Sequence, residues 1–194
     1  MNKHTHLEGF AAPEALTLKA PAKKMSPVKT LSSIATRQKP NDVFITPPAL
    51  ALMQIEMTEV FKNEVWYDPF RNSGSYFNQF PAECAKVWSE ILDGKDFFEY
   101  EGTVDVICSN PPFSLMNRVL DKCMKLQPRV ISLLMGCLNL TLPRARRMSG
   151  QGYHIRQLRM VNVKGWGPGT TYLVEWVKTD TPFVTALTFD YLNR

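Results

Sequence analysis

Apolar and polar positions along the chain predict short buried strands that alternate with helices. Four segments have the length and composition of strands, at residues 65–68, 86–90, 104–107 and 130–135, and the last is entirely apolar apart from one serine. Apolar residues recur at helical spacing over residues 47–61 and 115–126. Two alternating segments follow, 155–163 and 171–177, and their short connection favours an antiparallel hairpin. The pattern is that of an α/β protein whose sheet ends in an antiparallel hairpin.

The first 40 residues break this pattern. They contain several prolines, Ala-rich stretches and scattered lysines without a sustained period. We therefore predict a disordered basic tail at 1–40 and one folded domain at 41–194. The chain has no apolar run as long as a membrane span, and its N-terminus lacks the apolar core of a signal peptide. We expect a soluble intracellular protein with no membrane contact.

Charge is distributed unevenly along the sequence. Residues 1–40 carry seven Lys and Arg against two Asp and Glu, residues 41–128 carry seven against thirteen, and residues 129–194 carry nine against three. A polyanion would be attracted to the tail and the last third. Solvated surfaces also carry such charge runs, so this interpretation stays open for single residues. Nucleic-acid contacts are expected from the neighbouring Arg144, Arg146 and Arg147, in a segment predicted to be a loop or a broken helix.

The four cysteines are spread out without a CxxC spacing. Three of them lie in apolar runs, so we interpret them as reduced thiols in the core. The three histidines are also isolated from one another or lie in the tail. We expect no metal site.

The stretch 103–114 is the most informative part of the chain. Its buried strand stops at Asn110-Pro111-Pro112, because two prolines cannot donate to a sheet and force an extended exit. Asn110 and Phe113 are thereby placed at the carboxyl end of a strand, where open α/β sheets bind ligands. An amide oxygen, free main-chain carbonyls and an aromatic face together suit a planar ring that bears an exocyclic amine.

The sequence Asn110-Pro111-Pro112-Phe113 resembles the Asp/Asn/Ser-Pro-Pro-Tyr/Phe/Trp signature of S-adenosylmethionine-dependent amino methyltransferases, best known among DNA adenine-N6 enzymes. The resemblance covers residues 42–178. It implies a Rossmann-like class I methyltransferase fold, S-adenosyl-L-methionine as cofactor, and a catalytic role for these four residues.

A second segment resembles the Asp-Pro-Phe-x-Gly-x-Gly cofactor loop of the same family. The match comprises Asp68, Pro69, Phe70 and Gly74, which the resemblance marks as cofactor-binding. Asn72 departs from the pattern, since it stands where the first glycine is expected. Asparagine tolerates left-handed backbone angles better than other non-glycine residues, so we expect the turn to survive.

Further cofactor contacts follow from the same resemblance. Glu90 lies 22 residues after Asp68, a spacing suited to an acid that holds ribose hydroxyls. Asp96 and Phe97 match the family's Asp-Phe pair around the cofactor's adenine. Phe44 and Thr46 match the element beside the methionine end, where Thr46 also has the character of a helix N-cap.

The resemblance implies methyl transfer to the N6 amine of adenine in DNA. Only 42 residues separate Asp68 from Asn110, which leaves no room there for a target-recognition domain. Recognition would then depend on the arginine segment, the turn at 165–169, or a partner subunit or homodimer. Three alternatives stay open: an RNA base methyltransferase, a protein glutamine methyltransferase, and a catalytically silent relative that binds nucleic acid or a partner. A P-loop is absent from the sequence, which argues against a further alternative, an unrelated nucleotide-binding module.

Overall fold

Seven strands form one mixed sheet in the computed structural model, which describes residues 44–163, 166, 170–181 and 186–192. The strand order is β2-β1-β3-β4-β6-β5-β7. The strands are β1 Val65–Asp68, β2 Ala85–Trp88, β3 Val106–Ser109, β4 Val130–Gly136, β5 Tyr153–Val163, β6 Thr171–Lys178 and β7 Ala186–Leu192. They belong to the unit Asn41–Arg194, and the tail predicted at 1–40 lies outside the described residues.

The direction of the strands confirms the expected mixed sheet. β2, β1, β3 and β4 are parallel, whereas β6 runs antiparallel to both β4 and β5. Continuous apolar runs in β3 and β4 suit this arrangement, because parallel strands are covered on both faces. The sequence pattern missed β7, which pairs parallel with β5 at the edge of the sheet. Of the turn predicted at 165–169, only Trp166 lies within the described residues.

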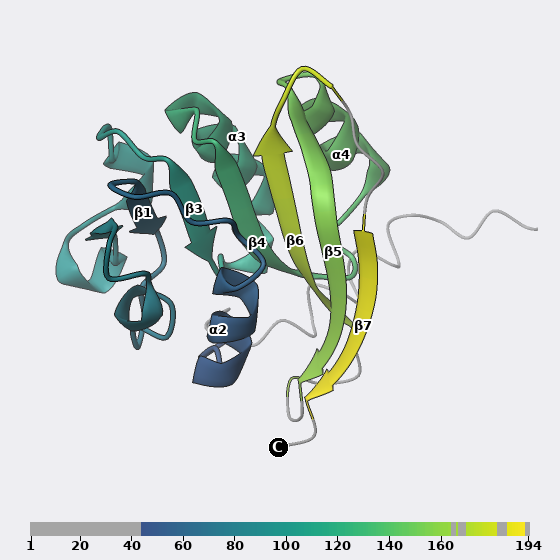
Figure 1. Ribbon diagram of the computed structural model, residues 1–194, viewed down its shortest axis with the longest axis horizontal. Coiled ribbons are helices and arrows are strands. Elements are labelled where there is room, and N and C mark those ends of the chain that lie inside the picture. The colour runs from purple at the N-terminus through teal and green to yellow at the C-terminus, as the bar shows by residue number, and fades with distance from the viewer. Residues whose placement is uncertain (1–43, 164–165, 167–169, 182–185, 193–194) are drawn as a thin grey trace, which may run out of the picture. The chain divides into compact units, whose positions relative to one another are not determined.

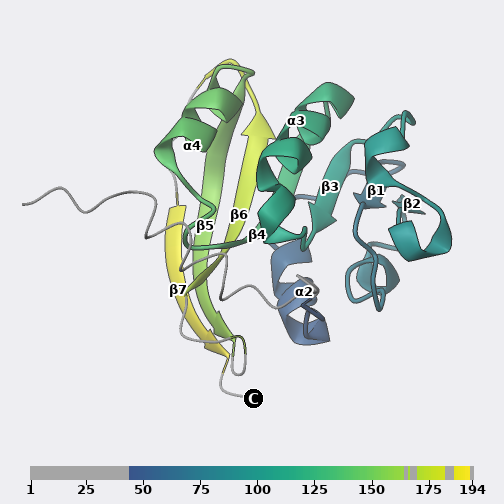
Figure 2. The same ribbon diagram turned by 180° about the vertical axis from the view of Figure 1, so that it is seen from behind.

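Helices cover both faces of the sheet. Helix α2 (Pro48–Ile55) lies on one face, and α3 (Met116–Leu126) and α4 (Leu142–Ser149) lie on the other (Figures 1 and 2). A hydrophobic core lies on each face of the sheet, because successive side chains of β3 point to opposite faces. Val106 packs in the core beneath α2, and Ile107 packs in the core beneath α3. None of the described helices is long and apolar enough to cross a lipid bilayer.

Helix α2 is shorter than its apolar pattern predicts. It ends at Ile55, and its N-cap is Pro47, so the predicted capping role of Thr46 is wrong. The residues after Ile55 have other partners: Thr58 Oγ1 donates a 2.6 Å hydrogen bond to the buried Glu175 of β6. The Met57 carbonyl likewise accepts from Gln157 Nε2 at 3.0 Å. Backbone amides 57 and 58 bond to the carbonyls of Gln54 and Ile55 in a turn that ends the helix.

The segment after β4 is more regular than expected. Instead of a loop or a broken helix, residues 142–149 form α4, with Pro143 in its first turn, where a missing N–H costs nothing. Short 3-10 turns complete the unit: η1 Phe77–Gln79, η2 Ile91–Asp93, η3 Phe97–Glu99 and η4 Phe113–Leu115. Of the four free cysteines, Cys84, Cys108 and Cys123 are buried as predicted, whereas Cys137 is exposed.

Candidate active site

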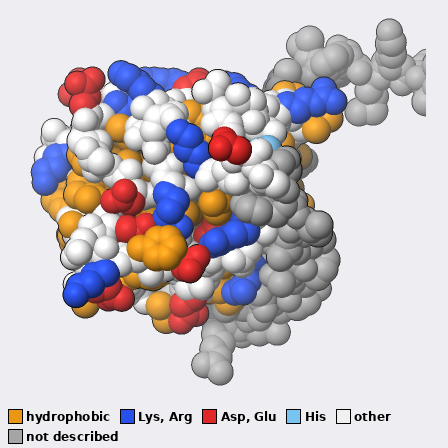
Figure 3. Space-filling model, turned by 45° about the horizontal axis from the view of Figure 1, so that its top comes forward, with side chains coloured by type: hydrophobic (Ala, Val, Ile, Leu, Met, Phe, Trp, Pro, Cys, Tyr) orange, Lys and Arg blue, Asp and Glu red, His pale blue; other side chains and the backbone are white. Residues whose placement is uncertain are grey.

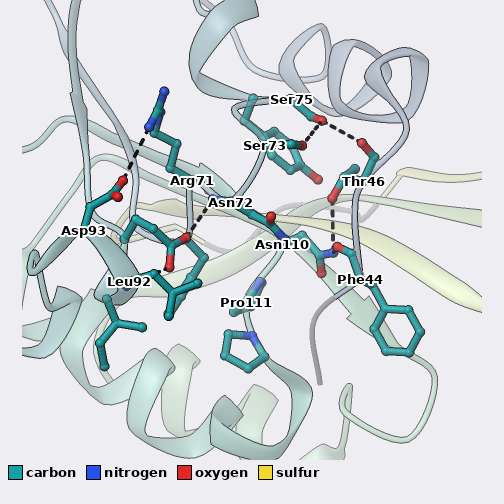
Figure 4. A pocket seen from close by; sticks show the side chains of 15 residues that line it. Phe44, Thr46, Arg71, Asn72, Ser73, Ser75, Leu92, Asp93, Asn110 and Pro111 are labelled. Carbon is teal, nitrogen blue, oxygen red and sulfur yellow. Dashed lines mark hydrogen bonds and ion pairs between the residues drawn. The ribbon is translucent and has the colours of Figure 1, made fainter. Parts of the chain in front are cut away.

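A cavity of about 440 Å³ lies at the carboxyl ends of β1, β2 and β3. Its wall combines the loop after β1, the loop after β2, the Asn110-Pro111-Pro112 exit from β3, and the two residues Phe44 and Thr46 before α2 (Figure 4). The size is within the range of small-molecule sites, and the position is where an open α/β sheet binds ligands. Separate loops thus form one pocket, as the sequence predicts for Asn110 and Glu90.

The amide group of Asn110 is fixed by two acceptors. Its Nδ2 donates to the Phe44 carbonyl at 3.2 Å and to Thr46 Oγ1 at 3.1 Å (Figure 4). A primary amide has two N–H donors, so both are engaged. The Oδ1 atom is therefore the part of the side chain that can accept a hydrogen bond from a ligand.

An aromatic group flanks this amide. The ring of Phe113 stacks on that of Phe44, with centroids 6.2 Å apart and planes at 28°. Phe44 also lies 5.4 Å from the Trp166 ring. Phe113 packs closely over Gly136, where a Cβ atom would lie 3.1 Å from the ring. Pro111 and Pro112 line the cavity, whereas Phe113 lies behind Phe44 and outside the wall formed by described residues.

The loop after β1 has the predicted left-handed backbone. Asn72 has φ 44° and Gly74 has φ 83°. At Gly74 a side chain would also collide with Asn78, whose Nδ2 lies 2.9 Å from the ideal Cβ position. The prediction that asparagine supports this turn is confirmed. Gly74 lies in the loop but not on the described wall of the cavity, whereas its neighbours Ser73 and Ser75 line the cavity.

Glu90 lines the cavity and joins two of its loops. Its Oε2 accepts a 2.8 Å hydrogen bond from the Asn72 amide, and its Oε1 accepts from the Leu92 amide at 3.3 Å. Each carboxylate oxygen keeps a second lone pair, so the group can still accept from a ligand hydroxyl. The geometry suits the predicted ribose contact.

Asp68 lies beneath the loop after β1. It is fully buried, and its Oδ1 accepts from Ser109 Oγ at 2.6 Å and from the Phe70 amide at 3.4 Å. Its Oδ2 has no hydrogen-bond partner within the described residues. Burial raises the pKa of the Asp68 carboxyl to about 7, and the hydrogen bond from Ser109 opposes that shift. The structure thus places Asp68, and the buried Pro69 after it, under the loop and not on the cavity wall.

Asp96 and Phe97 also lie outside the described wall of the cavity. Asp96 Oδ1 accepts from the Phe98 amide at 2.8 Å and so caps η3. Phe97 is buried, with its ring 5.2 Å from that of Phe70, which lines the cavity. Of the three acids expected to face one cofactor, only Glu90 lies on the described wall of the cavity, and like the other two it also accepts from backbone amides.

Sequence reasoning missed several residues of the wall, among them Ser73, Ser75, Tyr76 and a group beside Glu90. Arg71, Ile91, Leu92 and Asp93 line the cavity beside Glu90. Ile91 and Leu92 are 70% and 90% exposed, an unusual state for large apolar side chains. Arg71 lies over the Trp88 ring at 4.5 Å and 3.7 Å from Asp93. Adjacency to Glu90 was a signal for Ile91 and Leu92, since residues next to a ribose-binding acid lie beside the same ligand.

The arginines near α4 have mostly structural partners. Arg144 donates to Asn117 Oδ1 at 2.8 Å and to the Asn139 carbonyl at 2.7 Å. Arg147 pairs with Asp121 at 3.0 Å. Arg146 is exposed on the last turn of α4. The nucleic-acid contacts expected from the three arginines stay a prediction, in which Arg144 and Arg147 already have acceptors from α3 and the loop after β4.

The basic last third does not produce a uniformly basic surface. Arg129 pairs with Glu64 at 2.7 Å, and Arg156 pairs with the buried Glu175 at 2.8 Å. On the face shown in Figure 3, basic and acidic side chains of the described residues are interspersed. Some of the basic residues of the last third are thus paired with acids where elements pack together.

Comparison with known proteins identifies the fold. No family model and no curated protein matches the sequence. A putative class I S-adenosylmethionine-dependent methyltransferase from Listeria monocytogenes is similar in structure, with a TM-score of 0.57, 12% identity, and 86% of this chain and 71% of that chain covered. The E. cuniculi Mtq2–Trm112 complex, which methylates the translation termination factor eRF1, is similar with a TM-score of 0.55 and 17% identity. The match covers 72% of this chain and 100% of that chain. A putative RNA methyltransferase from Pyrococcus horikoshii has a TM-score of 0.53 and 15% identity, and the match covers 78% of this chain and 98% of that chain. The chain therefore has the fold of class I S-adenosylmethionine-dependent methyltransferases.

Proposed function

We propose that this protein transfers a methyl group from S-adenosyl-L-methionine to the exocyclic N6 amine of adenine in DNA. The observation that carries the proposal is the amide of Asn110, whose donors are both held by Phe44 and Thr46. An amide fixed in this way presents a pure acceptor to the cavity. A pure acceptor is what binds a planar amine, which has hydrogens to donate.

The residues of the wall fit the cofactor. Glu90 has lone pairs for the ribose hydroxyls, and the exposed Ile91 and Leu92 offer apolar surface to an adenine ring. Asn110 lies on the same wall as Phe44 and Thr46, which the family resemblance associates with the methionine end. When bound, S-adenosylmethionine supplies an electrophilic methyl group on a sulfonium centre.

For this reaction the protein mainly has to position the amine against the methyl group. An aromatic amine is a poor nucleophile, because its lone pair is delocalised into the ring. Asn110 Oδ1 and the Pro111 carbonyl would accept the two amine hydrogens and turn the lone pair toward the methyl carbon. The new N–C bond would form as the C–S bond breaks and releases the neutral thioether, and the methylated, positively charged amine would then lose one proton to water. Positioning and stabilisation of positive charge on nitrogen would supply the rate enhancement.

Adenine is favoured as the acceptor by the aromatic rings beside Asn110. Phe44 gives the cavity wall an aromatic ring, against which Phe113 stacks from outside the wall, and such a ring suits a base that has left the duplex stack. A base in RNA or a glutamine amide of a protein would satisfy the same acceptors. Asn72, in place of a glycine beside Glu90, motivates the silent alternative.

Labelled S-adenosylmethionine incubated with separate DNA, RNA and protein pools tests the proposal. We expect label in DNA, recovered as N6-methyladenine after nucleoside analysis. Asn110→Ala should abolish that product and leave cofactor binding by calorimetry intact, with Asn162→Ala on β5 as a control that retains activity. Label in RNA or protein instead of DNA would show that DNA is not the substrate. Failure to bind S-adenosylmethionine would favour the catalytically silent alternative.

A further inference from the structure

A serine of the loop after β1 is bonded to the segment that holds Asn110. Ser75 lines the cavity, and its hydroxyl donates a 2.7 Å hydrogen bond to the Thr46 carbonyl (Figure 4). A carbonyl can only accept, so the proton of this bond belongs to Ser75. The hydroxyl of Ser73, 3.2 Å away, is then the donor to Ser75 Oγ. The loop that the family resemblance marks as cofactor-binding is thereby joined to the residue whose side chain accepts from Asn110.

Gln79 makes a second connection between the same two segments. Its Nε2 donates to the Ser75 carbonyl at 2.6 Å and to the Pro48 carbonyl at 2.9 Å. Both partners are carbonyls, so the atom between them is the amide nitrogen and not the amide oxygen. Gln79 itself lies outside the described wall of the cavity. One side chain therefore holds the main chain of Ser75 and the start of α2 together.

The segment before α2 is held largely through its carbonyls. Pro47 and Pro48 have no backbone N–H, so hydrogen bonds to their main chain can only go to oxygen. The Asn110 amide takes both of its acceptors from this segment, the Phe44 carbonyl at 3.2 Å and Thr46 Oγ1 at 3.1 Å. A shift of the Thr46 main chain would move both acceptors. The orientation of Asn110 Oδ1 thus depends on where the Thr46 main chain is held.

We infer that Ser75 and Gln79 are positioning residues for methyl transfer, which hold the acceptor amide of Asn110 through the main chain of residues 46–48. This inference rests on the proposed function, because it takes Asn110 Oδ1 as the acceptor for the substrate amine. The loop expected to hold the cofactor and the amide expected to hold the amine are then fixed relative to each other by one set of hydrogen bonds. Methyl donor and amine are aligned by the same side chains.

Ser75→Ala removes the hydroxyl that holds the Thr46 carbonyl. We expect kcat to fall about tenfold and the Kd for S-adenosylmethionine to stay within about threefold of the wild type, because a small loss of alignment lowers the rate of a positioned reaction. Ser75→Thr keeps the hydroxyl and should restore most of the rate. A Kd that rises while kcat stays unchanged would make Ser75 a plain cofactor contact and overturn the inference.

Gln79→Glu tests the second connection from outside the cavity wall. The substitution keeps the length of the side chain and puts an oxygen where Nε2 donated, so the carbonyls of Ser75 and Pro48 lose their donor. We expect kcat to fall about tenfold here as well, with the Kd for S-adenosylmethionine again nearly unchanged. Tyr153→Phe is the matched control, because it also removes one hydroxyl that donates to a backbone carbonyl. Its partner is Pro128 at 2.8 Å, and Tyr153 lies outside the described cavity wall.

A further readout does not depend on turnover. The side-chain amide signal of Asn110 in nitrogen-15 NMR can be assigned by its loss in Asn110→Ala. We expect its hydrogens to exchange with water about fivefold faster or more in Ser75→Ala and in Gln79→Glu, with no change in Tyr153→Phe. Unchanged exchange in Ser75→Ala, or an equal fall of kcat in Tyr153→Phe, overturns the inference. A wild-type protein that transfers no methyl group contradicts the proposed function, while the exchange measurement still decides whether Ser75 and Gln79 hold Asn110.

Discussion

The backbone amide of Asn72 lies 2.8 Å from Glu90 Oε2 and joins the loop after β1 to the loop after β2. Asn72 reaches this position with a φ of 44°, an angle that few non-glycine residues adopt. The residue that departs from the family pattern is thus compatible with the turn, and its main chain helps to hold the acid that lines the cavity.

The left-handed backbone at Asn72 gives a stability prediction. Asn72→Ala should lower the free energy of unfolding by about 1 kcal/mol relative to Asn72→Gly, because an ordinary side chain is strained at positive φ. Urea denaturation of the two variants measures the difference. Equal stabilities would mean that the loop does not hold this backbone angle in solution.

The charge of Glu90 should matter for cofactor affinity. Glu90→Gln keeps one oxygen acceptor and loses the negative charge, so we expect the Kd for S-adenosylmethionine to rise about tenfold, which corresponds to one weakened charge-assisted hydrogen bond. Isothermal titration calorimetry reports the affinity. Glu83→Gln provides the control, since Glu83 is an exposed acid just before β2 and lies outside the described cavity wall. The same affinity in both variants would remove Glu90 from the binding site.

Asp68 should make stability depend on pH. Burial raises the pKa of its carboxyl from 3.8 in the unfolded chain to about 7 in the fold. Between these values the folded protein keeps a proton that the unfolded chain has lost, so rising pH favours unfolding. This contribution lowers stability by about 1.4 kcal/mol per pH unit in that window and is constant above it.

Asp68→Asn removes this titration and keeps an oxygen that can accept from Ser109. Its free energy of unfolding, measured relative to the wild type, should therefore rise from pH 4 to pH 8. Urea denaturation at several pH values gives both curves. Parallel curves for variant and wild type would show that the carboxyl titrates normally in the fold.

The arginines of α4 should separate into two kinds. Arg144→Ala should lower the free energy of unfolding by about 1–2 kcal/mol, because Asn117 and Asn139 lose a half-buried partner. Arg146→Ala should leave stability unchanged, and it should reduce the salt dependence of DNA binding by about one phosphate contact if this face binds DNA. Thermal denaturation and a salt titration of binding measure the two effects. A salt dependence that stays unchanged would place DNA on another face.

Sequence reasoning predicted the elements whose pattern is local. β1 matches its predicted bounds, α3 begins one residue after its predicted start, and the apolar run 130–135 is β4 with one residue added. The proline exit at Asn110 and the turn at Asn72 followed from backbone restrictions that the sequence states directly. These features need no knowledge of distant partners.

The predictions that differ from the structure concern features that depend on contacts between residues far apart in the sequence. Helix α2 stops at Ile55, and Thr58 just beyond it bonds to Glu175, which lies 117 residues away in the sequence. Asp96 is in the predicted place along the chain, yet it caps η3 and does not reach the cavity wall. The sequence gives no sign of the partners of Arg144, since Asn117 and Asn139 are brought to it only by folding. Linear spacing locates such side chains and cannot give the direction in which they point.

The exposure of Leu92 and Ile91 at the rim of the cavity has a thermodynamic consequence. At 90% and 70% exposure, both side chains order water in the empty protein. A ring that settles against them would release that water, and apolar burial of this kind has a negative heat-capacity change as its signature. Calorimetric enthalpies of cofactor association should accordingly become more exothermic on warming, and replacing Leu92 by serine should flatten that temperature dependence.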